Sequence, residues 1–317
     1  MVTLKELTTE ELLAPGHRLC GGCGASVAAR MALKMTRGPT VVVQSTGCLE
    51  VATTIYPYTA WRVPYAHIAF ENAAAVAGGI EAAFKALERR GAWKDHVDVI
   101  VFAGDGGTFD IGIQALSGAL ERRHDFVYIC YDNEAYMNTG IQRSGATPYG
   151  ASTTTSPAGS VIPGKAEWKK DFAGICAAHG IDHVSTASIA YWNDYMTKVR
   201  KAIEVDGPAV IHVLASCPRG WRCDTSDSIK MTRLAVQTRF FPLYEIEKGK
   251  YKLSMKVPKP LPVEELLKAQ GRFSHLFKPE RKGELEKIQR WTDENWNRIL
   301  SLCGEKPEQP PLQPGPA

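Results

Sequence analysis

The chain has 317 residues, a formal charge of +4 and 44% hydrophobic residues, which are ordinary values for a globular protein and predict no disorder in its body. It contains no apolar run of about 18 residues and no basic stretch followed by an apolar one, so we predict neither a membrane span nor secretion, and hence a cytoplasmic protein. Lys and Arg are dispersed rather than clustered with aromatic residues, which argues against nucleic acid as a ligand.

The N-terminal segment leads to a pair of closely spaced cysteines. TTEELL at 8–13 predicts a short helix that ends at Pro15-Gly16. The stretch HRLCGGCGAS then places Cys20 and Cys23 in a C-x-x-C spacing, and its glycines free backbone N–H groups to point at sulfur. Apolar spacing over 25–35 predicts a helix directly afterwards, whose N-terminus would favour thiolate or an anionic cluster.

A third cysteine follows a predicted strand. TVVVQS is a β-branched, apolar run that predicts a buried strand, and it delivers Cys48 at its end. The segment 49–67 is rich in aromatic residues and Pro and is expected to be a loop. The Ala-rich run over 70–91 predicts a helix with Gly91 as its C-cap.

The centre of the chain has the pattern of a metal-diphosphate site. Asp105 ends the predicted strand VIVFAG, and Asn133 ends the predicted strand FVYICYDN after one helix. A parallel βαβ unit would bring both side chains to the same carboxyl edge of the sheet, where open α/β sheets bind ligands. Mg²⁺ prefers oxygen ligands, and the glycines at 104, 106 and 107 allow close approach of a phosphate. A Gly-Asp-Gly alone is usually only a turn.

The chain then continues to alternate between predicted helices and strands. The polar stretch 141–159 is too long for an ordinary connection, which indicates a functional loop. The later elements expected are a helix over 166–180, a strand over 183–188, a helix over 194–205 and a strand over 208–215, which delivers Cys217. This alternation predicts an α/β fold with a doubly wound parallel sheet.

The pattern changes near the C-terminus. Residues 242–254 predict a hairpin with its turn at 248–250, followed by amphipathic helices over 262–271 and 282–302. We therefore divide the chain into an α/β domain at 1–237, a hairpin and helical extension at 238–305, and a Pro-rich tail at 306–317 that is expected to be extended or disordered.

The eight cysteines are read as metal ligands or buried thiols rather than disulfides. We select Cys20, Cys23, Cys48 and Cys217, because most of them lie at the edge that holds Asp105 and Asn133. Cys223 is the rival for the fourth place. Cys130, Cys176 and Cys303 are expected to be packing residues. Four thiolates suit either structural zinc or a [4Fe–4S] cluster, and spacing alone does not decide between them.

The central stretch resembles a known cofactor motif. Its GDG followed by Asn resembles the thiamine diphosphate motif, and YDNEAYMNTG resembles the form found in the β subunit of pyruvate:ferredoxin oxidoreductase and its 2-oxoacid:ferredoxin relatives. HRLCGGCGA, STGCLEV, FENAAAVAGGIEAA and CPRGW extend the resemblance from His17 to about Tyr251. It implies a thiamine diphosphate-binding fold.

The resemblance implies roles for particular residues. Asp105, Asn133 and the carbonyl of Ala135 would bind Mg²⁺, and Asn138 would lie beside the reacting carbons. Other cofactor-binding residues would be Gly104, Gly106, Gly107, Thr139 and Glu71. The four selected cysteines would hold a [4Fe–4S] cluster, which accepts electrons singly where zinc does not.

The resemblance also implies partners. The glutamate that activates the cofactor's aminopyrimidine belongs to another subunit in this family, so we expect this chain to be inactive alone. It would assemble with a pyrimidine-binding α-type subunit and a ferredoxin-like subunit, and it would pass electrons to ferredoxin.

The substrate is less determined. The family default is pyruvate with CoA, giving acetyl-CoA and CO₂. This chain has CGGCG where the family often has CAGCG, and SCPRGW where it often has PCPTGW. Arg219 adds positive charge near the cluster and is compatible with oxalate, which a branch of the family oxidises without CoA, although pairing with a surface carboxylate is the simpler interpretation. A non-redox thiamine decarboxylase with structural zinc is the remoter alternative.

Overall fold

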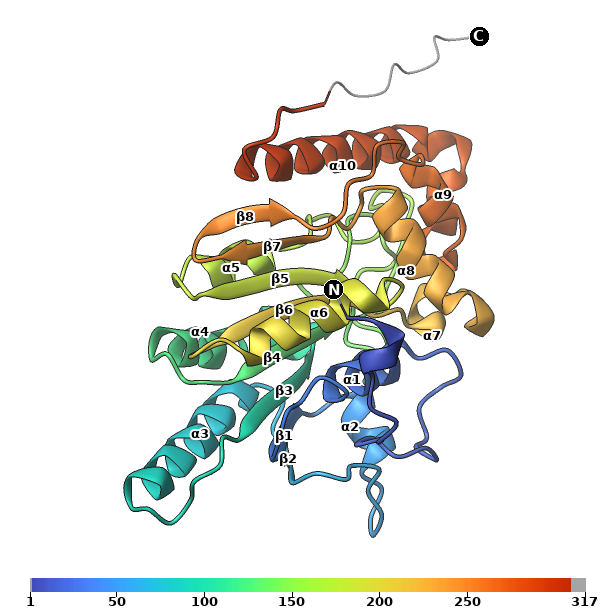
Figure 1. Cartoon of the computed structure of the whole chain (residues 1–317). Helices are drawn as coiled ribbons and strands as arrows, with labels where there is room; N and C mark the ends of the chain where they lie inside the picture. The colour runs from blue at the N-terminus through green and yellow to red at the C-terminus, as the bar shows by residue number, and fades with distance from the viewer. Residues whose placement is uncertain (1, 309–317) are drawn as a thin grey trace.

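The computed structural model describes residues 2–308, and within them an eight-stranded sheet runs through the molecule (Figure 1). In spatial order the strands are β2 (Tyr65–Ile68), β1 (Thr40–Ser45), β3 (Asp98–Gly104), β4 (Val127–Asp132), β6 (Ala209–Leu214), β5 (His183–Ser188), β7 (Tyr244–Glu247) and β8 (Lys250–Leu253). The first six pair in parallel, and β7 and β8 pair antiparallel. The strands that the sequence predicts are confirmed as β1, β3, β4, β5 and β6 and as the β7–β8 hairpin.

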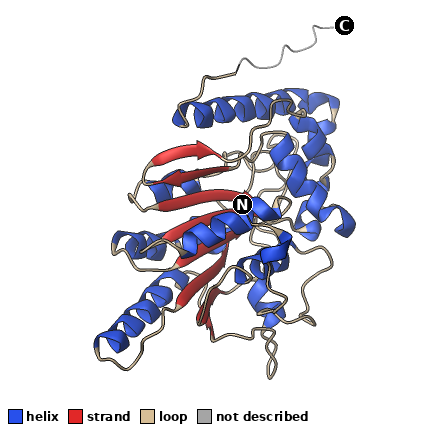
Figure 2. Cartoon of the chain, in the orientation of Figure 1, coloured by secondary structure: helices blue, strands red, loops and turns tan. Residues whose placement is uncertain are grey.

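Helices cover both faces of this sheet (Figure 2). They are α1 (Gly24–Leu33), α2 (Cys48–Thr53), α3 (Ala73–Arg89), α4 (Ile113–Glu121), α5 (Phe172–Ala177), α6 (Trp192–Ile203), α7 (Pro218–Trp221), α8 (Ser228–Gln237), α9 (Val263–Lys268) and α10 (Lys282–Leu302). Alternate residues of each strand enter different cores: Phe102 packs with α1 and α6, whereas Val101 packs with α3, α4 and α5. The predicted doubly wound α/β fold is therefore confirmed. None of the described helices is both long enough and apolar enough to span a bilayer.

The C-terminal hairpin continues this sheet. Strand β7 hydrogen-bonds to β5, and the turn at Lys248-Gly249 has positive φ at both residues, as a two-residue hairpin turn requires. Helix α10 begins and ends where the amphipathic pattern predicts. Of the predicted tail, residues 309–317 lie outside the described part of the chain.

Two predictions near the N-terminus were wrong. The segment 49–67 is not a plain loop, because it contains α2 and the edge strand β2, which extends the sheet beside β1. Residues 8–13 do not form a helix; a 3₁₀ turn at Leu4–Glu6 precedes them. Leu13 is buried and forms a β-bridge with Trp61, so tertiary contact overrides the local helical pattern.

The helix predicted over 166–180 is confirmed only at Phe172–Ala177. The residues before it are extended because their side chains reach different partners. Trp168 stacks between Tyr149 and Trp291, with ring centroids 4.6 and 4.8 Å away, while Lys169 enters the interior. One helical face cannot serve both directions.

Candidate active site

The carboxyl ends of β3 and β4 bring together the residues of the predicted metal-diphosphate site, Asp105, Asn133 and Ala135, which we call the clamp. These strands are neighbours, with Gly104 opposite Tyr131, so Asp105 and Asn133 follow them side by side. The backbone N–H of Asn133 donates to Asp105 Oδ1 at 3.3 Å, and Ser144 Oγ donates to Asp105 Oδ2 at 2.5 Å. The Asp105 carboxylate is fully buried and held at both oxygens.

The side chain of Asn133 and the carbonyl of Ala135 complete a small polar cluster. The amide atom of Asn133 that faces them lies 2.9 Å from Asp105 Oδ1 and 2.8 Å from the Ala135 carbonyl oxygen. The Asn133 amide can take two orientations that differ by a half-turn. In one, its NH₂ donates to both Asp105 Oδ1 and the Ala135 carbonyl; in the other, its oxygen faces them, so that three oxygens converge. Neighbouring ligands of octahedral Mg²⁺, at metal–oxygen distances of about 2.0–2.1 Å, lie about 2.9 Å apart. The donor set therefore fits Mg²⁺.

The electrostatics of Asp105 favour a bound cation. Burial raises the pKa of this carboxyl well above its usual range, and the negative charge of Asp132 raises it further. The nearby cation Lys169 pairs with Asp132 instead. A divalent ion would offset the cost of keeping Asp105 ionised in this environment.

A cavity opens beside this cluster, and its lining includes most of the predicted cofactor-binding residues. They are Thr46, Gly47, Cys48, Phe70, Gly104, Asp105, Gly106, Gly107, Tyr131, Asn133, Ala135, Tyr136, Met137, Asn138 and Thr139. Asn138 and Thr139 lie on its exposed rim. Glu71 is not among them. It lines a separate hollow between α3 and α4 with Arg122 and His124, because the chain turns there into α3.

Gly106 is required by close packing, and this gives a stability prediction. A Cβ at this position would overlap the ring of Tyr136, which stacks on Phe70 and donates to Asp110 Oδ2 at 3.1 Å. We expect Gly106→Ala to cost about 1–3 kcal/mol of unfolding free energy. Thermal or denaturant unfolding of the purified complex measures this. Gly79→Ala is the control, since Gly79 is exposed in α3 with open space around it and should gain roughly 0.5–1 kcal/mol.

The four selected cysteines form a second group at the same edge. The pKa of the Cys48 thiol is raised to about 12 by burial and then by the charges of Cys217, Cys23 and Cys20. These three thiols are likewise coupled to one another. The charged groups that act most on Cys223 are Arg272, Asp227 and Asp224. The four selected thiols thus lie close enough to act on one another electrostatically.

Two properties of the group bear on what it could hold. Among the described residues no three of these sulfur atoms lie within 4.8 Å of one another. Thiolates around a single zinc ion, at Zn–S of about 2.3 Å, are about 3.8 Å apart. One backbone N–H also points at sulfur, since that of Gly220 donates to Cys217 Sγ at 3.4 Å.

Close backbone contacts fix the C-x-x-C loop against the end of β6. The N–H of Gly24 donates to the Ser216 carbonyl at 2.9 Å, and a Cβ on Gly24 would overlap that backbone. Ser228 Oγ donates to the Gly22 carbonyl at 2.5 Å. The loop that carries Cys20 is therefore docked beside Cys217, over a long separation in sequence.

Sequence reasoning missed several residues that line the cavity or support its lining. Ser144, which holds Asp105, lies in the loop over 141–159 that was predicted to be functional without naming a residue. Tyr131 and Tyr136 were given no role, although both line the cavity. Their only signal was membership of the central motif.

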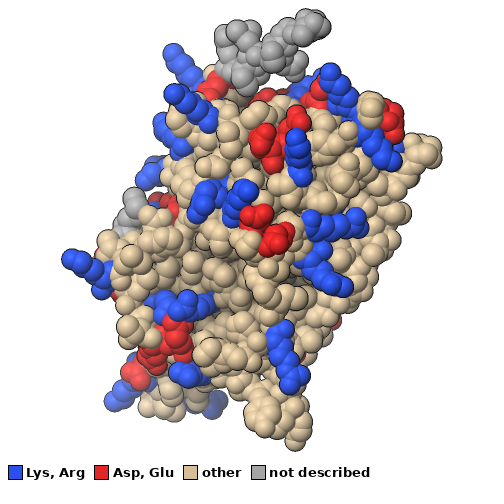
Figure 3. All heavy atoms as spheres, turned by 90° about the vertical axis from the view of Figure 1, so that its right-hand side faces the viewer, with Lys and Arg blue, Asp and Glu red and all other residues tan. Residues whose placement is uncertain are grey.

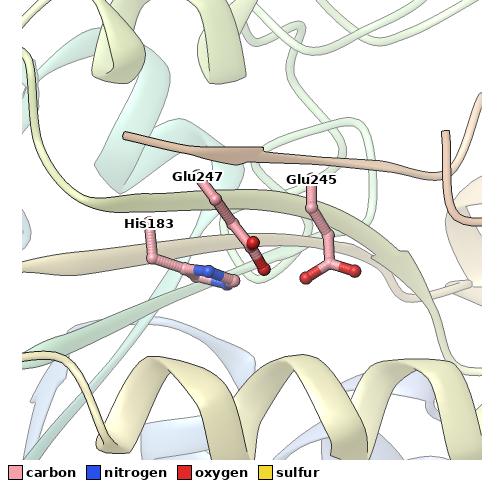
Figure 4. Close-up of side chains that lie close together, drawn as sticks. All are labelled: His183, Glu245 and Glu247. Carbon is pink, nitrogen blue, oxygen red and sulfur yellow. The ribbon is translucent and has the colours of Figure 1, made fainter. Parts of the chain in front are cut away.

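A separate group of potential ligands lies at the start of β5 and the end of β7, and consists of His183, Glu245 and Glu247 (Figure 4). Lys201 already supplies its cation, with Nζ 2.7 Å from Glu245 Oε2 and 2.8 Å from Glu247 Oε1. The group is therefore an ion-pair cluster with a neutral histidine.

This histidine gives a pH prediction. Burial lowers the pKa of His183 to about 4 from its usual 6.5, and Nε2 has no partner. The unfolded chain binds the proton first, so stability is retained above pH 6.5 and falls as the pH drops toward 4, by roughly 3 kcal/mol in all. Unfolding of the complex across this range measures it. His183→Gln should flatten the dependence, and an unchanged curve would contradict the assignment.

Comparison with known proteins defines the class. Residues 45–213 match the family model "Thiamine pyrophosphate enzyme, C-terminal TPP binding domain". This span contains Asp105, Asn133 and Cys48 and more than half of the chain. The chain is thus a thiamine diphosphate-binding protein.

Relatives narrow the family. The chain is 56% identical to pyruvate synthase subunit PorB of Methanothermobacter thermautotrophicus, over 95% of this chain and 99% of that one. It is 46% identical to the PorB of Thermotoga maritima, over 95% and 96%, and 48% identical to ketoisovalerate oxidoreductase subunit VorB of Pyrococcus furiosus, over 93% and 94%. It belongs to the β subunits of the 2-oxoacid:ferredoxin oxidoreductases, as predicted.

A solved structure shows the same fold. The 2-oxoglutarate:ferredoxin oxidoreductase from Magnetococcus marinus, with 2-oxoglutarate, coenzyme A and succinyl-CoA bound, superposes with a TM-score of 0.52. The likeness covers 73% of this chain and 84% of that chain at 19% identity, and therefore concerns the fold alone.

Proposed function

We propose that this chain holds thiamine diphosphate through Mg²⁺ and carries a [4Fe–4S] cluster beside it, in a complex that oxidatively decarboxylates pyruvate with CoA to acetyl-CoA and CO₂ and reduces ferredoxin. One observation carries the proposal. Cys48 lines the same cavity as Asp105 and Asn133, and its thiol is coupled to the other three selected cysteines. The residues that hold the diphosphate and a ligand of the electron acceptor would thus line the same cavity.

The chain's own residues would bind and orient the reactants. Asp105, the Asn133 amide oxygen and the Ala135 carbonyl would hold Mg²⁺, and the glycines of the cavity would leave room for the diphosphate. Bound thiamine diphosphate supplies the carbanion chemistry of decarboxylation, and the cluster supplies single-electron acceptance. Asn138 on the rim would donate a hydrogen bond to a substrate oxygen.

The rim also supports assembly with another subunit. Asn138 and Thr139 are exposed, so the cavity is open on that side. Figure 3 looks onto the carboxyl edge, where uncharged atoms occupy much of the surface among scattered Lys, Arg, Asp and Glu. Tyr56 and Tyr58, 95% and 77% exposed, project from the segment after α2. Such a surface suits a protein partner, and a pyrimidine-binding subunit would complete the site there.

Pyruvate is preferred because the relatives named pyruvate synthase match nearly the whole chain. The similar match to a ketoisovalerate oxidoreductase subunit makes a branched 2-oxoacid the second candidate. Oxalate stays the third candidate, because the exposed cation Arg219 lies beside Cys217.

Anaerobic viologen reduction by the purified complex tests the proposal. We expect activity with pyruvate that requires CoA, and weaker activity with 2-oxoisovalerate. Activity on oxalate without CoA would move the chain to the other branch. If the purified complex contained zinc in place of iron and acid-labile sulfide, the proposal of a [4Fe–4S] cluster would be wrong.

A further inference from the structure

Two acidic residues alternate with the clamp residues over 132–135, at the end of β4 and in the loop that follows it, and both are buried. The side chains of Asp132 and Glu134 are 0% and 3% exposed. Lys169 pairs with both, with Nζ 3.0 Å from Glu134 Oε1, and Arg272 pairs with the other oxygen of Glu134. Lys169 precedes α5 and Arg272 precedes α10, so distant parts of the chain meet behind this loop.

Glu134 has a left-handed backbone conformation, with φ at +70°. A non-glycine residue adopts this region at a cost, so other contacts must hold it there. Thr147 Oγ1 donates to the Glu134 carbonyl at 2.6 Å, and the two ion pairs hold the side chain. The turn at Glu134 lets the Asn133 amide and the Ala135 carbonyl face the same point.

Arg272 is itself rigidly placed. Its side chain is 4% exposed, its guanidinium lies 4.6 Å from the centre of the Trp221 ring, and its Nε donates to Gln270 Oε1 at 2.9 Å. Trp221 Nε1 donates to the Asn133 carbonyl at 2.8 Å. Arg272 therefore supports the loop both through Glu134 and through Trp221.

Another pairing secures the opposite end of the loop. His212 Nε2 lies 2.7 Å from Asp132 Oδ2, and the N–H of Glu134 donates to Asp132 Oδ1 at 2.9 Å. With Lys169 and Arg272 against Asp132 and Glu134, the two buried negative charges have two positive partners, of which Arg272 is buried and Lys169 is half-buried. Removal of one partner leaves a buried charge that must protonate or swing toward water.

We propose that Arg272 and Lys169 are positioning residues for the metal clamp: by holding Glu134 in its left-handed conformation they aim the Asn133 amide oxygen and the Ala135 carbonyl at the bound cation. Neither residue lines the cavity. The inference rests on the proposed function, because it assigns these residues to the same Mg²⁺ site.

Mn²⁺ binding measures the effect without turnover. In the metal-stripped complex with thiamine diphosphate added, Mn²⁺ titrations followed by EPR should show binding weakened about 10–100-fold in Arg272→Met and in Lys169→Met, as for outer-shell partners of other metal sites. Arg272→Lys keeps the charge and should restore most of the affinity. If the single variants fail to assemble, Glu134→Gln with Arg272→Met leaves no unpaired charge here and should still bind Mn²⁺ more weakly than the wild type.

Lys198→Met is the matched control. Lys198 is an equally buried cation, 1% exposed and 2.6 Å from Asp194 Oδ2, but it lies on α6 away from the clamp. It should lower stability and leave Mn²⁺ affinity unchanged. Equal weakening in Lys198→Met and Arg272→Met, or wild-type affinity in the double variant, would overturn the inference. Wild-type Mn²⁺ binding that does not respond to Asp105→Asn would instead contradict the proposed function.

Discussion

Replacing Asp105 by Asn should weaken binding of Mg²⁺ and thiamine diphosphate by more than about 100-fold, since even outer-shell changes at metal sites cost about 10–100-fold. Asp105 supplies the charged oxygen of the three that converge, and each of its oxygens accepts a hydrogen bond, so the NH₂ of an asparagine would face one of these two donors. We expect turnover with a 2-oxoacid to fall at least as far.

Cofactor titration of the reconstituted complex measures this loss, and EPR of the cluster should be unchanged. Asp98→Asn is a matched control, because Asp98 is a buried acid at the opposite end of β3 that accepts a hydrogen bond from the Arg37 N–H at 2.8 Å. It should lower stability and leave cofactor binding intact. Cofactor affinity retained in Asp105→Asn would remove Asp105 from the clamp.

Cys48→Ser should abolish viologen reduction while thiamine diphosphate binding persists. Cys48 is the selected cysteine that lines the cavity with Asp105 and Asn133, so the cluster that we propose it ligates would lie nearest the reacting atoms. A serine hydroxyl is a poor substitute for a soft thiolate at an iron–sulfur site. Anaerobic EPR and iron analysis should show that the cluster is lost or altered.

Cys223→Ser provides the comparison for this variant. Cys223 lies near Cys217 in sequence and is also half-buried, but its charged neighbours are Arg272 and two aspartates. The cluster EPR signal and the activity of the Cys223→Ser complex should match those of the wild type. If Cys48→Ser instead kept a full cluster signal and Cys223→Ser lost it, Cys223 and not Cys48 would be the ligand.

The main features of the fold follow from local patterns because each strand carries its own burial signal. Continuous apolar runs at β1, β3, β4 and β6 predict buried parallel strands, and parallel strands end at one edge. Asp105, Asn133, Cys48 and Cys217 each follow such a strand, so sequence order alone places them at that edge.

Short elements stabilised by distant partners did not follow from local patterns. Strand β2 exists because it pairs with β1, and residues 166–171 are extended because Trp168 and Lys169 have partners far away in sequence. Glu71 has the sequence neighbourhood expected of a cofactor residue but lies in a different hollow. These outcomes depend on which surfaces meet.

The sequence by itself determined the family, the parallel sheet and the residues that end its strands, because these depend on period, spacing and short motifs. Tertiary structure decided how those residues are held. The Ser144 contact to Asp105, the left-handed turn at Glu134 and the pairing of Glu134 with Arg272 join segments far apart in the chain. No local pattern encodes such contacts, because buried charges find their partners only when the whole chain has packed.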